Sequence, residues 1–137
     1  MPDPFVDTDV IIRLLTQDDA HKQAKAAALF KRIEAGELQA TAPVTTIADA
    51  VSVLSSLRLY KVPHADVAAL LSTLVRLRNF KISQRQTVLR ALDLFGTTHL
   101  DFGDAMIVAA MQQAGSQVVY SYDADFDRVK GITRKEP

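Results

Sequence analysis

The chain has 137 residues, equal numbers of acidic and basic side chains, and 48% hydrophobic residues, which is typical of one globular domain with an ordinary core. It contains no cysteine, which excludes a disulfide framework, a thiolate metal site and a cysteine nucleophile. The N-terminus does not resemble a secretory signal, and the longest apolar run, Ala105 to Met111, is too short to span a membrane. We therefore expect a single soluble domain over residues 1–137, in the cytoplasm and without membrane association.

Short apolar runs alternate with segments of helical periodicity. A run at Phe5–Val6 ends at Asp7, and apolar residues then recur at helical spacing over Val10–Leu15. Asp18 and Asp19 are expected to cap the next helix, which Gly36 closes. Further helices are predicted over 44–58, 64–78, 88–95 and 101–115, and further strands over Leu38–Ala42, Asn79–Ile82, Val118–Tyr120 and Gly131–Thr133. This alternation predicts an α/β fold whose parallel sheet carries helices on both faces.

The acidic residues are unevenly chosen and unevenly distributed. Thirteen are aspartate and three are glutamate, although glutamate is the better helix former, so short carboxylates are expected at caps, turns or a site. Residues 1–50 and 101–137 carry net charges of −3 and −2, whereas residues 51–100 carry +5. Acidic ends that meet beside a basic middle suit a metal site next to a polyanion, although solvated helix faces give the same totals.

Two aspartates are selected by their position after predicted strands. Asp7 ends the first strand and Asp123 follows the strand at 118–120. Ligands of parallel α/β sheets bind beyond the carboxyl ends of the strands, so both residues are candidates for a site. Asp9, two residues after Asp7, could cap the helix over Val10–Leu15.

Asp49 is the only charged residue between Leu38 and Leu57. At helical spacing it lies opposite the predicted apolar stripe, on a face that it shares with Thr45, Ser52 and Ser56. A small, uncharged face with one carboxylate fits a surface that looks into a cleft. An exposed helix with a side rich in serine and threonine is an equally good interpretation.

Five aspartates of the last third of the chain have possible structural uses. Asp101 fits the N-cap and Asp104 the third position of a predicted helix, an arrangement similar to a capping box. Asp123, Asp125 and Asp127 could cap a short turn, although three acids within five residues exceed what capping needs.

The candidate carboxylates favour a hard metal ion. His21, His64 and His99 have no metal-ligand spacing, and no thiolate is present. Carboxylates without histidine or cysteine favour Mg²⁺ or Mn²⁺ over zinc. Such sites clamp phosphates, and two ions about 4 Å apart can activate water and stabilise a leaving oxygen.

Four short segments hold most of these aspartates. They are FVDTDVIIR at 5–13, APVTTIAD at 42–49, LDFGDA at 100–105 and VYSYDADF at 119–126. In this order and spacing they resemble the acidic motifs of PIN-domain nucleases, especially the VapC-type toxins of bacterial toxin–antitoxin pairs. The resemblance covers about residues 4 to 133.

The resemblance implies a PIN-like three-layer α/β/α fold with a short central, mostly parallel sheet. It also implies an Mg²⁺- or Mn²⁺-dependent endoribonuclease that hydrolyses RNA, is blocked by a cognate antitoxin protein and forms a homodimer. Carried over by position, the catalytic residues are Asp7, Asp49, Asp104 and Asp123. Of these, Asp7, Asp104 and Asp123 would hold metal. The residues that would orient or extend this cluster are Thr8, Ser121 and Asp125.

Two residues depart from the pattern of the family. The second acid is usually glutamate, and Asp49 is one methylene shorter, which puts the strength of metal binding in doubt. Asp9 stands where asparagine is common and adds a charge that could raise cation affinity.

The resemblance also implies a chemistry and a substrate path. Attack by an external water, rather than by the ribose 2′-hydroxyl, leaves a 5′-phosphate and a 3′-hydroxyl. Basic residues of the middle third could follow the RNA backbone, contact an acidic part of an inhibitor, or face solvent. These residues are Arg58, Lys61, Arg76, Arg78, Lys81 and Arg85.

Two alternatives remain open. Asp7 and Asp9 after an apolar strand also resemble the opening of haloacid-dehalogenase-like phosphatases, in which the first aspartate is a nucleophile. A catalytically silent PIN-like interaction module is the other alternative, if Asp49 cripples metal binding. Leucines of the helices at 44–58 and 64–78 would then form a dimer interface or simply belong to the core; they are Leu54, Leu57, Leu70 and Leu74.

Overall fold

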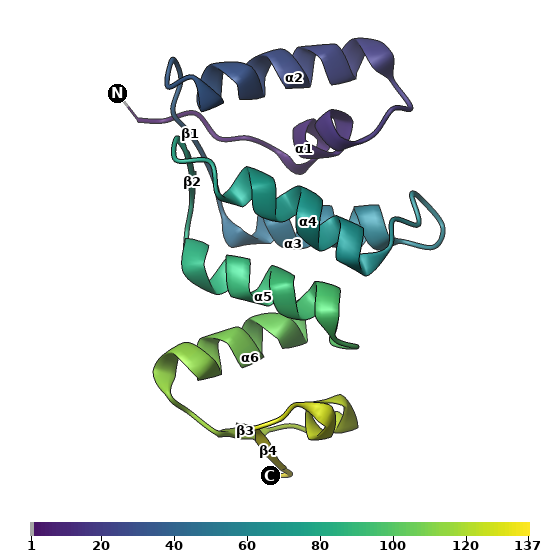
Figure 1. Cartoon of the computed structure of the whole chain (residues 1–137), viewed down its shortest axis with the longest axis vertical. Coiled ribbons are helices and arrows are strands. Elements are labelled where there is room, and N and C mark those ends of the chain that lie inside the picture. The colour runs from purple at the N-terminus through teal and green to yellow at the C-terminus, as the bar shows by residue number, and fades with distance from the viewer. Residues whose placement is uncertain (1) are drawn as a thin grey trace.

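Helices and short strands alternate along the chain, so the α/β prediction is confirmed (Figure 1). The structure is a computed structural model that describes residues 2–137. The helices are α1 (Thr8–Leu15), α2 (Ala20–Glu34), α3 (Val44–Ser55), α4 (His64–Val75), α5 (Arg85–Thr97), α6 (Phe102–Ala114) and the 3₁₀ helix η1 (Ala124–Arg128). The strands are β1 (Ala40–Ala42), β2 (Phe80–Ile82), β3 (Val118–Tyr120) and β4 (Thr133–Lys135).

Aspartate caps begin three of the α-helices. Asp7 caps α1, and its carboxylate accepts a hydrogen bond of 2.7 Å from the backbone N–H of Thr8. The cap is therefore not Asp9, because α1 begins two residues before the apolar periodicity does. Asp19 caps α2 and Asp101 caps α6, as predicted.

Several predicted boundaries differ from the structure by one to three residues. Helix α3 ends at Ser55 rather than at residue 58, because Ser56 leaves the helical region with ψ 127°. Helix α4 ends at Val75 rather than at residue 78. The last strand is Thr133–Lys135, because Gly131 adopts a φ of +85° that turns the chain where the strand was predicted to begin.

The strands form two parallel pairs rather than one continuous sheet. β1 pairs with β2, and β3 pairs with β4. Phe5 forms a single parallel bridge with Thr41 on the other edge of β1. The β1–β2 and β3–β4 pairs lie toward opposite ends of the molecule, with α5 and α6 between them (Figure 1). The predicted parallel direction is confirmed, while the predicted central sheet is divided.

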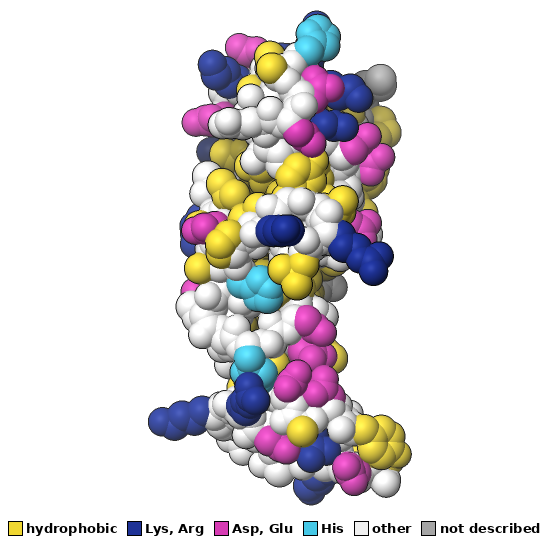
Figure 2. Space-filling model, turned by 90° about the vertical axis from the view of Figure 1, so that its right-hand side faces the viewer, with side chains coloured by type: hydrophobic (Ala, Val, Ile, Leu, Met, Phe, Trp, Pro, Cys, Tyr) yellow, Lys and Arg dark blue, Asp and Glu magenta, His cyan; other side chains and the backbone are white. Residues whose placement is uncertain are grey.

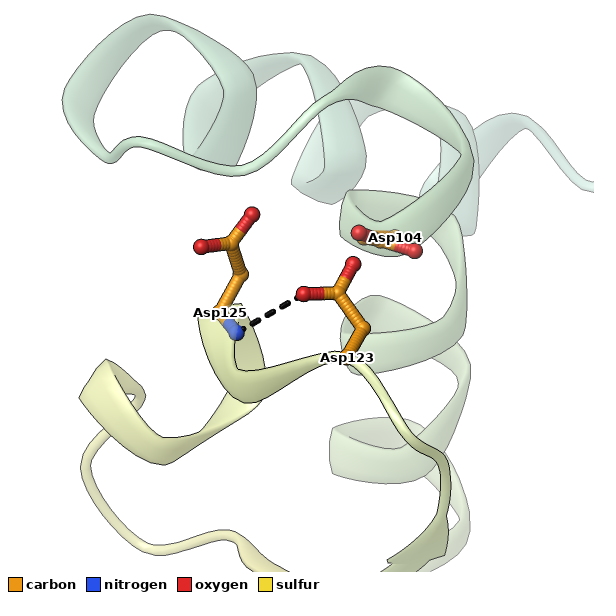
Figure 3. Close-up of side chains that lie close together, drawn as sticks. All are labelled: Asp104, Asp123 and Asp125. Atoms are coloured by element: carbon orange, nitrogen blue, oxygen red, sulfur yellow. Dashed lines mark hydrogen bonds between the residues drawn. The ribbon is translucent and has the colours of Figure 1, made fainter.

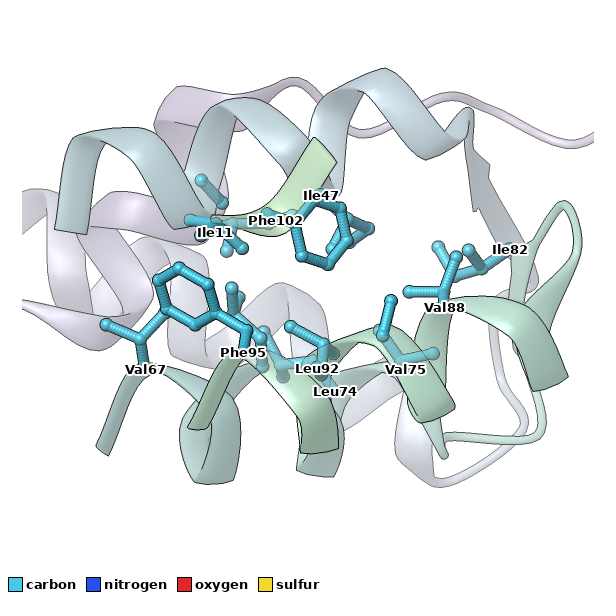
Figure 4. Packing of buried hydrophobic residues seen from close by; sticks show 14 of the residues in the cluster. Ile11, Ile47, Val67, Leu74, Val75, Ile82, Val88, Leu92, Phe95 and Phe102 are labelled. Carbon is cyan, nitrogen blue, oxygen red and sulfur yellow. The ribbon is translucent and has the colours of Figure 1, made fainter. Parts of the chain in front are cut away.

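A single cluster of buried hydrophobic residues connects the helices. Ile11 of α1, Ile47 of α3 and Leu92 of α5 point into it (Figure 4). The cluster also includes Leu54 and Leu74, which are 0% and 7% exposed. These two leucines therefore serve the core of the chain, and they are not available for a dimer interface.

Gly96 allows α4 and α5 to approach closely. A Cβ at Gly96 would lie 2.7 Å from the Cβ of Ala68. Gly96→Ala should therefore lower the free energy of unfolding by about 1–3 kcal/mol, although alanine is the better helix former. Urea denaturation checks this prediction.

Gly103→Ala is the matched control for this prediction, because a Cβ there meets only Asp101 Oδ1 at 3.6 Å. It should leave the stability unchanged or raise it. Adding Ala68→Gly to Gly96→Ala should restore part of the loss, and a stabilising Gly96→Ala would contradict the close-packing argument.

Candidate metal centre

Three aspartate side chains converge between the start of α6 and the loop after β3. Asp104 lies in the first turn of α6, while Asp123 caps η1 and Asp125 lies within it. One carboxylate oxygen from each residue lies within 4.8 Å of the other two (Figure 3). We call these three residues the acidic cluster. Asp104 is distant in the sequence from the other two, and the packing of β3 and η1 beside α6 brings them together.

Local hydrogen bonds fix the loop that carries Asp123 and Asp125. The hydroxyl oxygen of Ser121 accepts a hydrogen bond of 2.9 Å from the N–H of Asp123. Asp123 Oδ1 in turn accepts one of 2.9 Å from the N–H of Asp125. His99 Nε2 lies 2.8 Å from the carbonyl oxygen of Asp125. Ser121 therefore positions the backbone of the cluster rather than a carboxylate.

One buried aromatic ring anchors this loop. Phe126, the residue after Asp125, is 2% exposed and belongs to the hydrophobic cluster of the chain. The neighbouring acid, Asp127, is not part of the acidic cluster. It binds Arg134, with Oδ1 2.9 Å from Nε and Oδ2 3.1 Å from Nη2. Of the three acids between 123 and 127, Asp127 thus has a purely structural partner.

The pKa of Asp104 is raised above its ordinary value of 3.8. Partial burial is the largest cause, and the negative charges of Asp101 and Asp123 add to it. The folded chain therefore holds an ionised Asp104 at a cost in free energy. A cation at the acidic cluster would remove part of this repulsion.

The acidic cluster fits a hard divalent ion. Its ligands are carboxylate oxygens, without histidine nitrogen or thiolate, and Mg²⁺ and Mn²⁺ prefer such ligands. Oxygens about 2.1 Å from Mg²⁺ lie at most about 4.2 Å apart. The three side chains, with oxygens within 4.8 Å of one another, would need to move closer together to coordinate one ion, because at most one pair of three ligands can be trans.

Asp7 and Asp49 lie outside the acidic cluster and line a hollow of about 590 Å³. We call it the N-terminal hollow; Ser52 and Tyr60 also line it. Asp49 is on α3, opposite the buried Ile47 and Val51, as the helical spacing predicts. Thr8 contributes its backbone N–H to the Asp7 carboxylate rather than its hydroxyl.

A second hollow leads from the N-terminal hollow toward α6. It has a volume of about 480 Å³ and is lined by Thr45 and Ser52 of α3 and by Asp101 and Gly103. Because Ser52 lines both hollows, they adjoin each other. The polar face of α3 that contains Asp49 therefore borders a cleft. This favours a surface that looks into a cleft over an exposed helix side rich in serine and threonine.

Asp18 does not cap α2, although the sequence suggested that it could. Its carboxylate accepts hydrogen bonds from Tyr60 Oη at 2.7 Å and from Thr16 Oγ1 at 3.1 Å. The bond from Tyr60 is the largest cause of the lowered pKa of Asp18. This contact ties the loop before α4 to the end of α1, beside the N-terminal hollow.

A basic hollow, which the sequence analysis did not identify, adjoins the N-terminal hollow. It has a volume of about 480 Å³, and its basic lining residues are Arg13, His21, Lys22 and Lys25. Asp9 and Arg13 line both hollows. Spacings of three and four residues place the side chains of α2 on one face, and this pattern is the sequence signal that could have found them.

Some of the basic residues of the middle third have partners within the chain. Lys81 forms an ion pair of 2.9 Å with Asp3, and Arg85 Nη2 donates a hydrogen bond to the carbonyl oxygen of Phe80. Arg76 lines a separate hollow with Arg90 and Asp93. Lys81, Arg85 and Arg76 line neither the basic hollow nor the N-terminal hollow.

Within residues 2–137, no helix has both the length and the apolar composition needed to cross a membrane. No curated protein matches the sequence closely enough to count as a relative. The model of the PIN domain matches residues 5–132, which includes all four acidic segments. PIN domains are typically metal-dependent nucleases that act on RNA. Because the match covers almost the whole chain, this protein belongs to the PIN-domain family.

Proposed function

We propose that this chain is an Mg²⁺- or Mn²⁺-dependent endoribonuclease. The observation that carries the proposal is the convergence of Asp104, Asp123 and Asp125 in a chain whose residues 5–132 match the PIN domain. The raised pKa of Asp104, caused first by partial burial and then by the neighbouring aspartates, adds support, because a cation would stabilise its ionised form.

In this proposal Asp104 and Asp123 are ligands of the metal, and Asp125 is a further ligand. A bound divalent ion supplies an activated water and neutralises charge on the phosphate. Ser121 holds the Asp123 backbone in place through its hydroxyl oxygen. Asp7 would complete the metal site and Asp49 would take the place of the second acid, with Thr8 holding the Asp7 carboxylate through its N–H.

The basic hollow is proposed as the path of the RNA backbone. Lys22 and Lys25 line it, and it adjoins the N-terminal hollow that contains Asp7 and Asp49. Phosphates held there would place the neighbouring sugar–phosphate link near these carboxylates.

Changing Lys22 and Lys25 to glutamine should weaken RNA binding, because the variant neutralises fewer phosphates. The slope of log affinity against log salt should fall by about 0.7 for each lysine that binds a phosphate, or about 1.4 for the double variant on single-stranded RNA. Fluorescence anisotropy at several salt concentrations, with Ca²⁺ in place of Mg²⁺, measures this slope. Lys31→Gln is the matched control, because Lys31 is exposed on α2 outside the hollow. An unchanged slope in the double variant would show that the RNA backbone binds elsewhere on the protein.

The test of the proposed reaction is cleavage of labelled RNA by the purified chain. Activity should require Mg²⁺ or Mn²⁺, disappear with a chelator, and leave a 5′-phosphate and a 3′-hydroxyl. A 2′,3′-cyclic phosphate would identify attack by the ribose hydroxyl and contradict the proposal. Absence of Mn²⁺ binding that depends on the aspartates would instead favour a silent interaction module.

We further propose that the chain is the toxin of a toxin–antitoxin pair, acts in the cytoplasm and forms a homodimer. The order of the four acidic segments supports this finer assignment, because it resembles that of VapC-type toxins. Induced expression should arrest growth, and co-expression of a small protein encoded next to this chain should restore it. A chain that cleaves RNA without arresting growth, beside no such gene, would be an RNA-processing nuclease.

A further inference from the structure

Aromatic rings line the second hollow, which lies between α3 and the start of α6. Its volume is about 480 Å³, and its aromatic residues are His64, Phe95 and Phe102. The His64 imidazole stacks on the Phe95 ring, with centroids 4.1 Å apart and planes 20° apart, and Phe95 meets Phe102 edge to face. We call this space the aromatic hollow. A volume in this range and a lining of mostly apolar and aromatic side chains are typical of small-ligand sites.

The His64 ring has one covered face and one exposed face. Phe95 and Phe102 are 3% and 6% exposed and belong to the core, whereas His64 is exposed. Because one face of the imidazole lies against Phe95, the exposed surface of the ring is its other face and its edge. The contact with the buried ring also holds the imidazole in one orientation. Nucleobases of single-stranded RNA stack on aromatic side chains of this kind, histidine included.

The polar groups of the aromatic hollow suit the edge of a base. Thr45 and Ser52 of α3 are exposed and present hydroxyl groups. Asp101 Oδ1 accepts a hydrogen bond of 2.8 Å from the N–H of Asp104, which leaves Oδ2 as an acceptor for a ligand. Hydroxyl groups both donate and accept, and the edges of nucleobases carry both donors and acceptors.

The charge of the aromatic hollow favours a base over the other possible occupants. Its lining contains Asp101 and neither lysine nor arginine, so it repels a phosphate. An apolar side chain of another protein would bury the Asp101 carboxylate and the neighbouring hydroxyls without a partner, which costs free energy. A base satisfies the lining in both respects, because its faces are apolar and its edge is polar. The lysines that suit phosphates line the basic hollow instead.

The aromatic hollow adjoins both groups of carboxylates. Ser52 also lines the N-terminal hollow, which contains Asp7 and Asp49. Gly103 lines the aromatic hollow and directly precedes Asp104 of the acidic cluster. On one face of the molecule, histidine and hydrophobic side chains lie above the gathered acidic side chains (Figure 2). A base in the aromatic hollow therefore belongs to a nucleotide whose sugar and phosphate lie toward the carboxylates.

We propose that the aromatic hollow binds one nucleobase of the RNA, stacked on His64 and next to the bond that is cleaved. The position beside that bond rests on the proposed nuclease function, whereas base binding does not. The aromatic hollow then helps to select the RNA sequence, while the basic hollow holds the backbone whatever its sequence.

Titration with adenosine tests base binding without phosphate or metal. The imidazole proton signals of His64 should shift and saturate, because the stacked base adds its ring current. The other two histidines, His21 and His99, lie outside the aromatic hollow and serve as internal references. Ribose 5-phosphate is the matched control ligand, since it lacks the base, and should leave the His64 signals unchanged. His64 signals that stay unmoved up to the solubility limit of adenosine, or that move equally with ribose 5-phosphate, would overturn the proposal.

Two oligomers of equal length and charge isolate the contribution of the bases. They are an oligoadenylate and an abasic ribose-phosphate oligomer, and fluorescence anisotropy with Ca²⁺ in place of Mg²⁺ measures their binding. His64→Ala should weaken binding of the oligoadenylate by about 5- to 150-fold, which is the range for loss of base–aromatic stacking. It should leave binding of the abasic oligomer unchanged, which also shows that the variant is folded.

Two further variants complete this test. His64→Phe keeps a flat ring and should retain most of the affinity for the oligoadenylate. Leu70→Ala is the matched control, because Leu70 is also an exposed residue of α4 but lies outside the aromatic hollow. Equal losses for the two oligomers in His64→Ala, or undiminished binding of the oligoadenylate, would overturn the proposal.

Cleavage of RNA tests the position of the base. A single abasic ribose next to the cleaved bond should slow cleavage by the unmodified chain, and it should not slow His64→Ala further. Substrates that are cut equally fast with the abasic ribose at every position near the bond would overturn this placement. A chain that binds adenosine at His64 but cleaves no RNA would refute the nuclease function and leave base binding intact.

Discussion

Replacing Asp104 with asparagine should abolish metal-dependent RNA cleavage and, in the same protein, raise the stability of the metal-free chain. Loss of a group that only orients a metal ligand costs about 10–100-fold in affinity or activity, so loss of a proposed ligand should cost at least about 100-fold. The stability should rise because burial and the charges of Asp101 and Asp123 oppose ionisation of Asp104. Rates of RNA cleavage and urea denaturation without metal measure the two effects.

The pH dependence of this gain has a defined sign. The pKa of Asp104 is higher in the folded chain than its ordinary value of 3.8, so the folded state binds this proton more tightly than the unfolded state does. The stability that proton binding by Asp104 contributes is fully present below the pKa of the unfolded state and is lost as pH rises through the pKa of the folded state. The gain in stability of Asp104→Asn over the unmodified chain should therefore grow between the unfolded and the folded pKa and stay constant at higher pH. Mn²⁺ affinity of the unmodified chain should rise with pH over the same range.

Asp66→Asn is the matched control for Asp104→Asn. Asp66 is exposed and has the same third position in α4 that Asp104 has in α6, but it lies outside the acidic cluster. Its loss should cost about 0.3–1 kcal/mol of favourable interaction with the helix dipole and leave cleavage unchanged. Full metal-dependent activity of Asp104→Asn, or a lower stability at neutral pH, would contradict the role assigned to Asp104.

Most of the local structure could be predicted from the sequence because local interactions determine it. The N-caps Asp19 and Asp101, and the end of α6 at Gly115 with a φ of +73°, depend only on neighbouring residues. The face of α3 that contains Asp49 followed from helical spacing alone. The start of α1 at Thr8 was missed because Asp7 and Thr8 precede the first apolar residue of the stripe.

The arrangement of the strands could not be predicted in the same way. Each strand has three residues, and alternation with helices predicts parallel direction without saying which edges meet. For the same reason, sequence order could group Asp123 and Asp125, which closely follow β3, with an acid of the preceding helix. It could not decide whether Asp7 and Asp49 reach that cluster, because this depends on which strands pair with one another.

Truncating Phe126 should destroy the acidic cluster without changing a carboxylate. The ring is 2% exposed and is the only side chain of η1 in the buried core, so it anchors the segment between Asp123 and Arg128. Phe126→Ala should cost about 3–5 kcal/mol, a large part of a total stability of about 5–15 kcal/mol. Without this anchor, the hydrogen bonds from the N–H groups of Asp123 and Asp125 are exposed to water, and the loop should open locally.

The expected signature of Phe126→Ala is loss of Mn²⁺ affinity together with faster amide exchange in residues 121–128, while α3 and α4 keep their protection. Tyr122→Ala is the matched control, because this aromatic residue of the same loop is 75% exposed. It should change stability by less than about 0.5 kcal/mol and leave the Mn²⁺ affinity unchanged. If Phe126→Ala bound Mn²⁺ as tightly as the unmodified chain, the metal ligands would have to lie elsewhere, since a carboxylate pair on an unanchored loop loses the preorganisation that makes it a metal site.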